Sequence, residues 1–213
     1  AVAVLRLREA SRTRAFWLLA FAFFVCGWST NGLVGTHFVP AAHDHGMPAT
    51  TAAGLLALIG VFDLVGTIGS GWLTDRYDPR KLLLVYYAGR GLSLLIVHLF
   101  WAPTVQPPMF FFVVLYGLDW VATVPPTVAL CRECFGGARA GVVFGWVFAS
   151  HMVGAGISAV VSGVIRETTG SYDWAWWSAG GLCLLAAWAS YAVPRGDVLR
   201  VADPAPEPQL TPR

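Results

Sequence analysis

Four ionisable residues interrupt the long apolar stretches of this 213-residue chain. They are Asp63, Arg90, Asp119 and His151, and each lies well inside a different apolar block. A charge near the middle of a bilayer costs ~2.5–3.5 kcal/mol even on the lenient insertion scale, so such groups face one another or a watery cavity. Secondary transporters hold solutes and coupling ions at this depth. The pattern therefore predicts one shared polar site.

The chemistry of each group indicates a role in moving a solute or a proton. Arg90 is a candidate ligand for an anionic solute, or the ion-pair partner of Asp63 or Asp119. Both carboxylates and His151 are candidates for carrying a proton, because burial disfavours the charged form of either group. Asn31, in the first apolar block, is a further candidate for lining the cavity. Any one of these side chains alone could equally make a helix–helix hydrogen bond.

Six apolar blocks of this sequence carry these groups and are long enough to cross a bilayer, which takes about 20 helical residues. Charged residues make up only 12% of the chain and hydrophobic residues 56%, which leaves too little polar surface for a soluble globule. Lipid admits helices or closed barrels, and the blocks lack the alternation of barrel strands. The sequence therefore predicts an all-α, polytopic membrane protein. Its six transmembrane helices are expected at about 16–39, 51–74, 82–102, 109–130, 140–165 and 174–193.

Basic residues gather on one side of these spans. Twelve of the fourteen Lys and Arg residues precede the first block or follow the second, fourth and sixth. Lys and Arg are retained in the cytoplasm during insertion, so both termini are expected there, in a multi-pass protein of the cell (inner) membrane. Residues 1–15 are then the end of a cytoplasmic linker. The Pro-rich residues 194–213 are expected to form a disordered cytoplasmic tail.

The stretch "GWLTDRYDPRK" concentrates charge between the second and third blocks. It resembles the loop motif G-x-x-x-D-R-x-x-x-R-[RK] of the major facilitator superfamily, which lies between the second and third helices of each six-helix half. Gly71, Asp75, Arg76, Arg80 and Lys81 fill its positions, although "DP" stands where Gly is common. The resemblance implies a gating loop whose contacts break as a transporter inverts. A plain membrane anchor accounts for the last two cations, which can reach anionic lipid headgroups.

Further stretches carry the same resemblance. "SGVIRETTGSYDWAW" resembles the family's link from the eleventh to the twelfth helix, and "FFVCGWSTNGLVGTHFVPAAHDHGM" resembles the seventh helix of bacterial members near the monocarboxylate and oxalate/formate transporters. The chain is thus expected to be the C-terminal half of a twelve-helix fold, built from two inverted three-helix repeats. The missing N-terminal six-helix half would lie upstream in the same chain or be replaced by a second copy.

The resemblance implies a secondary active transporter that works by alternating access, with a small solute, a proton or other coupling ion, and the bilayer as partners. A small organic anion such as a monocarboxylate is the expected solute class. One departure weakens this expectation, because Asp63 is followed one turn later by Thr67 where that branch has an Arg. A membrane-embedded receptor or scaffold without transport, and half of a drug/proton antiporter, are the alternatives.

Several functions are not indicated by the sequence. We expect no enzyme, because H-E-x-x-H, G-x-S-x-G and paired-carboxylate motifs are absent, and we expect no cofactor and no nucleic-acid partner. His37, His43, Asp44 and His45 could supply metal ligands, but histidines in short loops are more often solvated, so no metal site is predicted. The C-x-x-C of residues 131–134 lacks the two further ligands that zinc requires and is expected to be reduced.

Two helix features indicate close packing or motion. The fifth block carries small residues at four-residue spacing, which let helices approach one another: Gly141, Gly145 and Ala149, then Ala155, Ala159 and Gly163. Pro125 and Pro126 remove backbone donors from the fourth block and are expected to bend it. This bend could be a hinge or a fixed kink.

Overall fold

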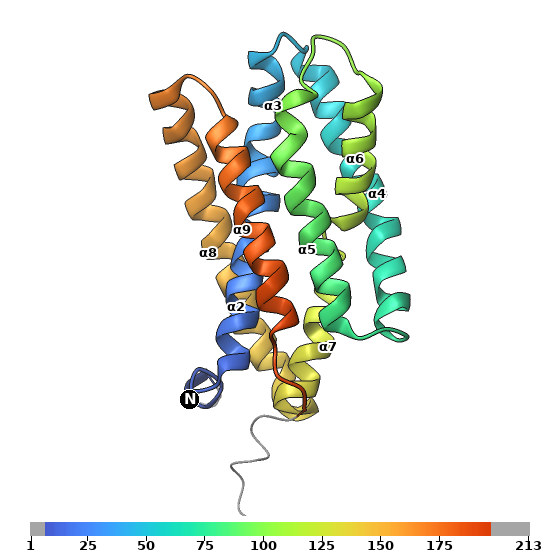
Figure 1. The fold of residues 1–213 in the computed structure, drawn as a ribbon, viewed down its shortest axis with the longest axis vertical. Helices are drawn as coiled ribbons and strands as arrows, with labels where there is room; N and C mark the ends of the chain where they lie inside the picture. Colours follow the sequence, from blue (N-terminus) through green and yellow to red (C-terminus); the bar gives the residue numbers. More distant parts are fainter. Residues whose placement is uncertain (1–6, 197–213) are drawn as a thin grey trace, which may run out of the picture.

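The computed structural model describes residues 7–196, and every regular element in that range is a helix (Figure 1). Three segments form the first long helix: α2 (Arg14–Gly27), the π-helical η1 (Trp28–Val34) and α3 (Gly35–Asp44). The next are α4 (Ala49–Thr74), α5 (Pro79–Ile96) and the short 3₁₀ turn η2 (Val97–Leu99). The chain continues through α6 (Pro107–Asp119), α7 (Val124–Phe135), α8 (Gly137–Thr169) and α9 (Asp173–Tyr191).

Five helical runs within the described residues are long and apolar enough to cross a membrane: Arg14–Asp44, Ala49–Thr74, Pro79–Leu99, Pro107–Phe135 and Gly137–Thr169. The remaining long helix, α9, is not among them. It has 19 residues, and its tryptophans, glycines and serines lower its mean hydropathy. It nevertheless packs lengthwise against α5. The predicted all-α, six-helix class is therefore confirmed, with the sixth helix identified by its packing.

The helix pairs repeat within the bundle. α5 packs against α9, α2 and η1 pack against α8, and α4 packs against α6. In terms of span numbers, these pairs are 3 with 6, 1 with 5, and 2 with 4. If each of spans 1, 2 and 3 is exchanged for span 4, 5 and 6 respectively, the same three pairs result. The first span of each set is also irregular near its middle, at η1 and at residues 120–123. This arrangement is the one expected of two three-helix repeats.

Glycines let the α2–α8 pair approach closely. A Cβ atom at Gly27 would collide with the carbonyl group of His151, and one at Gly154 with that of Phe24, so α2 and α8 touch backbone to backbone. The predicted stripe of small residues on α8 behaves differently. At Gly141 and Gly145 there is open space instead of a neighbouring helix. Small residues favour close approach of helices, but the position of the neighbouring helix decides which of these small residues lie in a contact.

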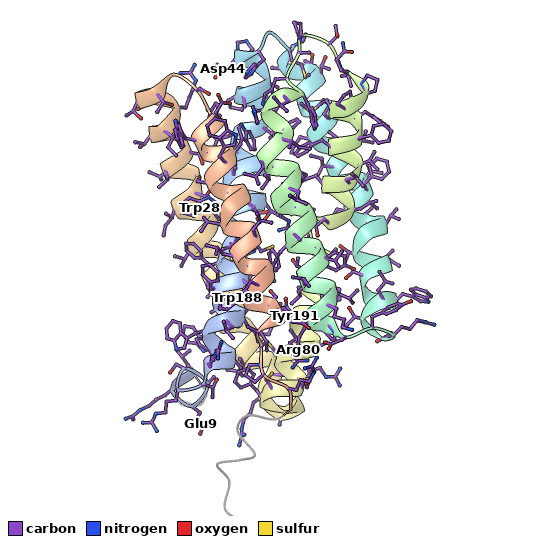
Figure 2. All side chains as sticks on the ribbon, viewed as in Figure 1. Glu9, Trp28, Asp44, Arg80, Trp188 and Tyr191 are labelled. Carbon is purple, nitrogen blue, oxygen red and sulfur yellow. The ribbon has the colours of Figure 1, made fainter. Side chains whose placement is uncertain are left out.

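Labelled side chains mark the two ends of the bundle. Arg80 and Glu9 lie at one end, whereas Asp44 lies at the opposite end (Figure 2). The predicted linker over residues 1–15 is described only from residue 7, and the predicted tail only to residue 196. The remainder of both segments lies outside the described residues.

Candidate functional site

A helix break lies at mid-length in the fourth predicted span. α6 ends at Asp119 and α7 begins at Val124. Pro125 and Pro126 therefore occupy the first turn of a new helix, where a missing N–H costs little. The break frees backbone groups that need other partners, and the Ser70 hydroxyl donates a hydrogen bond to one of them, the Ala122 carbonyl. The predicted bend is thus an interruption placed just before the prolines.

Arg90 extends from α5 into this break and is completely buried in its side chain. Its Nε donates to Asp119 Oδ2 at 2.6 Å, and Nη2 donates to the backbone carbonyls of Asp119 and Trp120. Its Nη1 contacts Cys26 Sγ at 3.3 Å and Ser29 Oγ at 3.4 Å. A guanidinium carries five N–H donors, and here each has an acceptor. Arg90 therefore joins α5, the first span and the end of α6.

Asp63 approaches the same break from α4. Its Oδ1 accepts hydrogen bonds from the backbone N–H of Val121 at 2.9 Å and from the Thr67 hydroxyl at 3.1 Å. Asp63 is half-buried and lines a pocket of about 250 Å³ together with Trp120 and residues of α3 and α4. The structure thus pairs Arg90 with Asp119, whereas Asp63 lines the pocket beside Trp120.

His151 lies on the buried face of α8, outside that pocket. Its ring packs against Phe23 and Phe148, with centroids 5.4 Å away in both cases. The Cys26 thiol lies within electrostatic range of both Arg90 and His151. The sequence analysis did not identify Cys26 as a site residue, because a cysteine within an apolar segment can equally serve only in packing. Arg90, Asp119 and Cys26 therefore form one polar centre. Asp63 binds the backbone of the helix break and His151 packs among aromatic rings, so the four predicted ionisable residues do not share one opening.

Asn31 has a different position from the buried groups. It lies in η1 and is exposed, and its carbonyl accepts a hydrogen bond from the Thr36 hydroxyl. Gly35, the next exposed residue one turn on, lines the pocket that contains Asp63. π-helical turns are rare and often occur at functional sites. Asn31, Gly35 and Asp63 belong to one uncovered face of the bundle.

Arg80, from the charged loop motif, is buried at the end of the bundle (Figure 2). It makes a bidentate contact with Glu133 on α7, at 3.0 and 2.9 Å. It also donates to the carbonyls of Val193 and Pro194, just after α9. The sequence analysis did not identify Glu133 as a partner of Arg80. Its only sequence signal was that it is an acidic residue between Arg132 and Cys134. This set of contacts ties α5, α7 and the end of α9 together.

The other motif residues lie on the surface around this contact. Arg76 stacks over the Trp72 ring at 4.1 Å, and Asp75 and Lys81 are exposed. Gly71 and Asp75 line a groove of about 390 Å³ between α4 and α7. The motif therefore separates into one buried arginine and an exposed edge.

At the opposite end, the candidate metal ligands contact protein groups. Asp44 pairs with Arg166 at 2.6 Å. His37 contacts the Ala159 carbonyl at 2.8 Å and the Tyr172 hydroxyl at 3.3 Å. Within residues 7–196 no group of three His, Cys, Asp or Glu side chains is arranged to hold a metal ion. The described cysteines, including those of the C-x-x-C, are free thiols.

Comparison with known proteins places this helical bundle in a family. The sequence profile described as Major Facilitator Superfamily matches residues 16–212. The chain is 28% identical over 164 residues to the uncharacterized MFS-type transporter YcxA of Bacillus subtilis, covering 76% of this chain and 40% of the relative. It is 29% identical over 160 residues to monocarboxylate transporter 13 of Rattus norvegicus, covering 74% and 37%. The chain thus spans less than half the length of these relatives.

A solved structure shares the fold. The Escherichia coli fucose:proton symporter FucP superimposes with a TM-score of 0.73 at 17% sequence identity. The match covers 89% of this chain and 45% of that one. The six-helix bundle therefore corresponds to about half of a larger helical fold.

Proposed function

Because the chain belongs to the Major Facilitator Superfamily, we propose that it forms half of a secondary transporter that moves a small solute by alternating access. The observation that carries this proposal is the helix break at residues 120–123, flanked by Asp63 on one side and by the Arg90–Asp119 pair on the other. Discontinuous helices near the bilayer midplane are where transporters of this kind bind solutes and ions. The π-helical segment η1 supplies a second irregular helix beside it.

The uncovered face that carries Asn31 and Asp63 is the proposed solute side. Asp63 is the candidate proton carrier, since it is an ionisable group that reaches the pocket beside Trp120. Arg90 has all five donors engaged, so it holds the break closed and is not free to bind a carboxylate. The monocarboxylate relative supports a small organic anion as the solute. Such an anion would need a cation from outside residues 7–196, or would cross in its protonated form.

The second half of the carrier is a proposed partner. It would be another six-helix bundle, encoded upstream of residue 1 or supplied by a second copy of this chain. In this arrangement the end of the bundle that carries Arg80 and both chain termini lie in the cytoplasm, and the protein is in the inner membrane.

Uptake by the complete transporter in proteoliposomes tests the function. A pH difference of one unit is worth about 1.4 kcal/mol per coupled proton, or about tenfold accumulation of solute. We expect wild-type protein to accumulate a solute from a carboxylate panel when the outside is acidic. Asp63→Asn should keep solute exchange in the absence of a gradient but lose the accumulation, because Asn accepts the same hydrogen bonds without carrying a proton.

Asp173→Asn, at the start of α9, is the matched control and should behave as wild type. Binding without any exchange would instead indicate a receptor. Solute efflux driven by an inward proton flow would indicate a drug/proton antiporter. Full accumulation by Asp63→Asn would remove this residue from the coupling path.

A further inference from the structure

A pocket of about 270 Å³ lies between α5 and α6, separate from the pocket beside Asp63. It exists because these two helices pack mainly on other partners, α5 on α9 and α6 on α4. Figure 1 shows α5 and α6 as neighbouring helices on the same side of the bundle. The pocket is lined by Val85, Tyr86, Gly89, Arg90, Ser93, Leu115, Tyr116, Leu118 and Asp119.

The mouth of this pocket faces lipid. Val85 and Leu115 at its rim are exposed, as are Leu92 and Phe111 on the same sides of α5 and α6. Large apolar side chains of this kind suit acyl chains. Asp63, in contrast, lines the separate pocket beside Trp120. A molecule would therefore enter the pocket from the hydrocarbon core and not from the solute pathway.

Asp119, which lines the pocket, carries an unpaired acceptor. Asp119 Oδ2 is held by Arg90, but Asp119 Oδ1 is buried and has no hydrogen-bond partner among the described residues. A buried acceptor without a donor is unfavourable. The Arg90–Asp119 pair is neutral as a whole, so a donor that brings no net charge matches it best. Tyr86 and Ser93 also line the pocket, and a water molecule needs two to four polar partners, so a bound water is the alternative that the experiment below tests.

We propose that this pocket binds the hydroxyl end of a neutral amphipathic molecule drawn from the acyl-chain region of the bilayer, with Asp119 Oδ1 as the acceptor. Its volume is below the ~300–1,000 Å³ of pockets that enclose drug-sized ligands. It therefore holds the end of such a molecule, and the remaining chain lies along the exposed side chains of α5 and α6.

Photolabelling of the chain in lipid nanodiscs tests the site, with a diazirine-bearing octanol as the probe and peptide mapping by mass spectrometry as the readout. Unlabelled octanol and its methyl ether serve as competitors, since the ether lacks the donor. Gly89→Leu should fill the pocket, because a side chain at Gly89 meets no heavy atom within 4 Å. Gly181→Leu on α9 is the matched control, with the same open surroundings.

The proposal expects labelling of residues 85–93 and 111–119 that octanol suppresses and the ether does not. Gly89→Leu should reduce this labelling by about tenfold or more, while Gly181→Leu leaves it unchanged. The proposal would be overturned if the ether competed as well as octanol, or if the label spread evenly over all the lipid-facing helices. Either result is expected if water occupies the pocket instead of a hydroxyl group. The competition experiment needs only wild-type protein, so it decides the matter even if Gly89→Leu fails to fold.

Discussion

At the scale of residues, the partners of Arg90 separate two roles that the sequence left open. The same guanidinium could have bound a solute or paired with either Asp63 or Asp119. In the bundle its donors are shared among Asp119, the carbonyl at Trp120 and the first span, while Asp63 accepts from Val121. A buried arginine with every donor engaged stabilises the helix break, and the half-buried Asp63 is the proposed site of proton exchange.

Removing Arg90 should destabilise the protein strongly. Arg90→Ala leaves Asp119 buried without its partner, and breaking such a pair costs about 3–5 kcal/mol. Arg90→Lys should restore little, because one ammonium cannot reach acceptors on separate helices as a planar guanidinium does. Unfolding of the purified protein in detergent, followed by circular dichroism, measures both effects.

The double variant Arg90→Met with Asp119→Leu is the control for this prediction. It removes both charges together, so it should be markedly less destabilised than Arg90→Ala. Wild-type stability of Arg90→Ala would show that the pair does not hold the break.

At the scale of elements, the bundle depends on where helices cross and where they end. The α2–α8 crossing uses Gly27 and Gly154, which lie against backbone carbonyls. The end of α9 is held differently, by charge-assisted hydrogen bonds from Arg80 to Val193 and Pro194. The glycine contacts fix the distance between α2 and α8, and the Arg80 hydrogen bonds fix the end of α9.

Gly154→Ala should separate α2 from α8. The added methyl group collides with the Phe24 carbonyl, and overpacking of this kind costs about 1–3 kcal/mol. Gly145→Ala is the control on the same helix, since its Cβ atom meets open space, and its thermal unfolding should match wild type. Equal unfolding temperatures for both variants would contradict the backbone contact.

Arg80→Gln should release the segment after α9. Loss of the contacts to Glu133, Val193 and Pro194 should increase amide hydrogen exchange over residues 191–196, while α5 itself stays protected. Lys81→Gln, an exposed neighbour, is the control. Unchanged exchange in Arg80→Gln would show that the segment is held by other contacts.

The same segment should respond to acid through Asp78. Burial raises the pKa of Asp78, but hydrogen bonds from the Arg80 backbone N–H and from the Arg195 guanidinium lower it more, so the net pKa is below its ordinary value. Its stabilisation is therefore present above the unfolded pKa of about 3.9 and is lost as the pH falls through the lower folded pKa. Hydrogen exchange over residues 191–196 should rise only below about pH 4. Asp78→Asn should reduce this dependence, and the remainder should come from Glu133, which accepts hydrogen bonds from Arg80 and from the Gly196 N–H.

At the scale of the whole molecule, the faces of the bundle differ in where polar and small residues are exposed. The face formed by α5, α6 and α9 exposes large apolar residues such as Val85, Leu115 and Trp188, which suits lipid. α4 and α8 also expose large apolar residues, such as Ile68 and Met152, but α8 exposes glycines as well, and Asn31 is exposed on η1. Small residues permit close contact with another helix, so we propose that the face of α8 and η1 that carries these glycines and Asn31 meets the other half of the carrier.

A bulky side chain on that face should block assembly without unfolding the bundle. Gly145→Trp on α8 should lower transport by about tenfold or more, the loss that corresponds to ~1.4 kcal/mol of contact energy. Gly181→Trp on α9 should leave transport unchanged, since it faces the other side. Normal transport by Gly145→Trp would show that α8 does not contact a second half.

The sequence alone determined the membrane class and the all-α, six-helix fold, and it predicted the limits of the helices and the depth of the ionisable groups. These follow from block length and composition, which act locally along the chain. It also indicated the family, through the motif that includes Gly71, Asp75 and Arg80. The irregular middle of two helices was only partly visible, because Pro125 and Pro126 mark the break at 120–123 while nothing comparable marks η1.

Only the tertiary structure decided which groups meet. Whether Arg90 pairs with Asp63 or Asp119, whether Gly145 or Gly154 makes the close crossing, and that Arg80 reaches Glu133 all depend on the rotation of each helix about its axis. Residue spacing along one helix does not specify that rotation relative to another. Packing settles it, because the backbone contacts and buried polar contacts of all the helices form together.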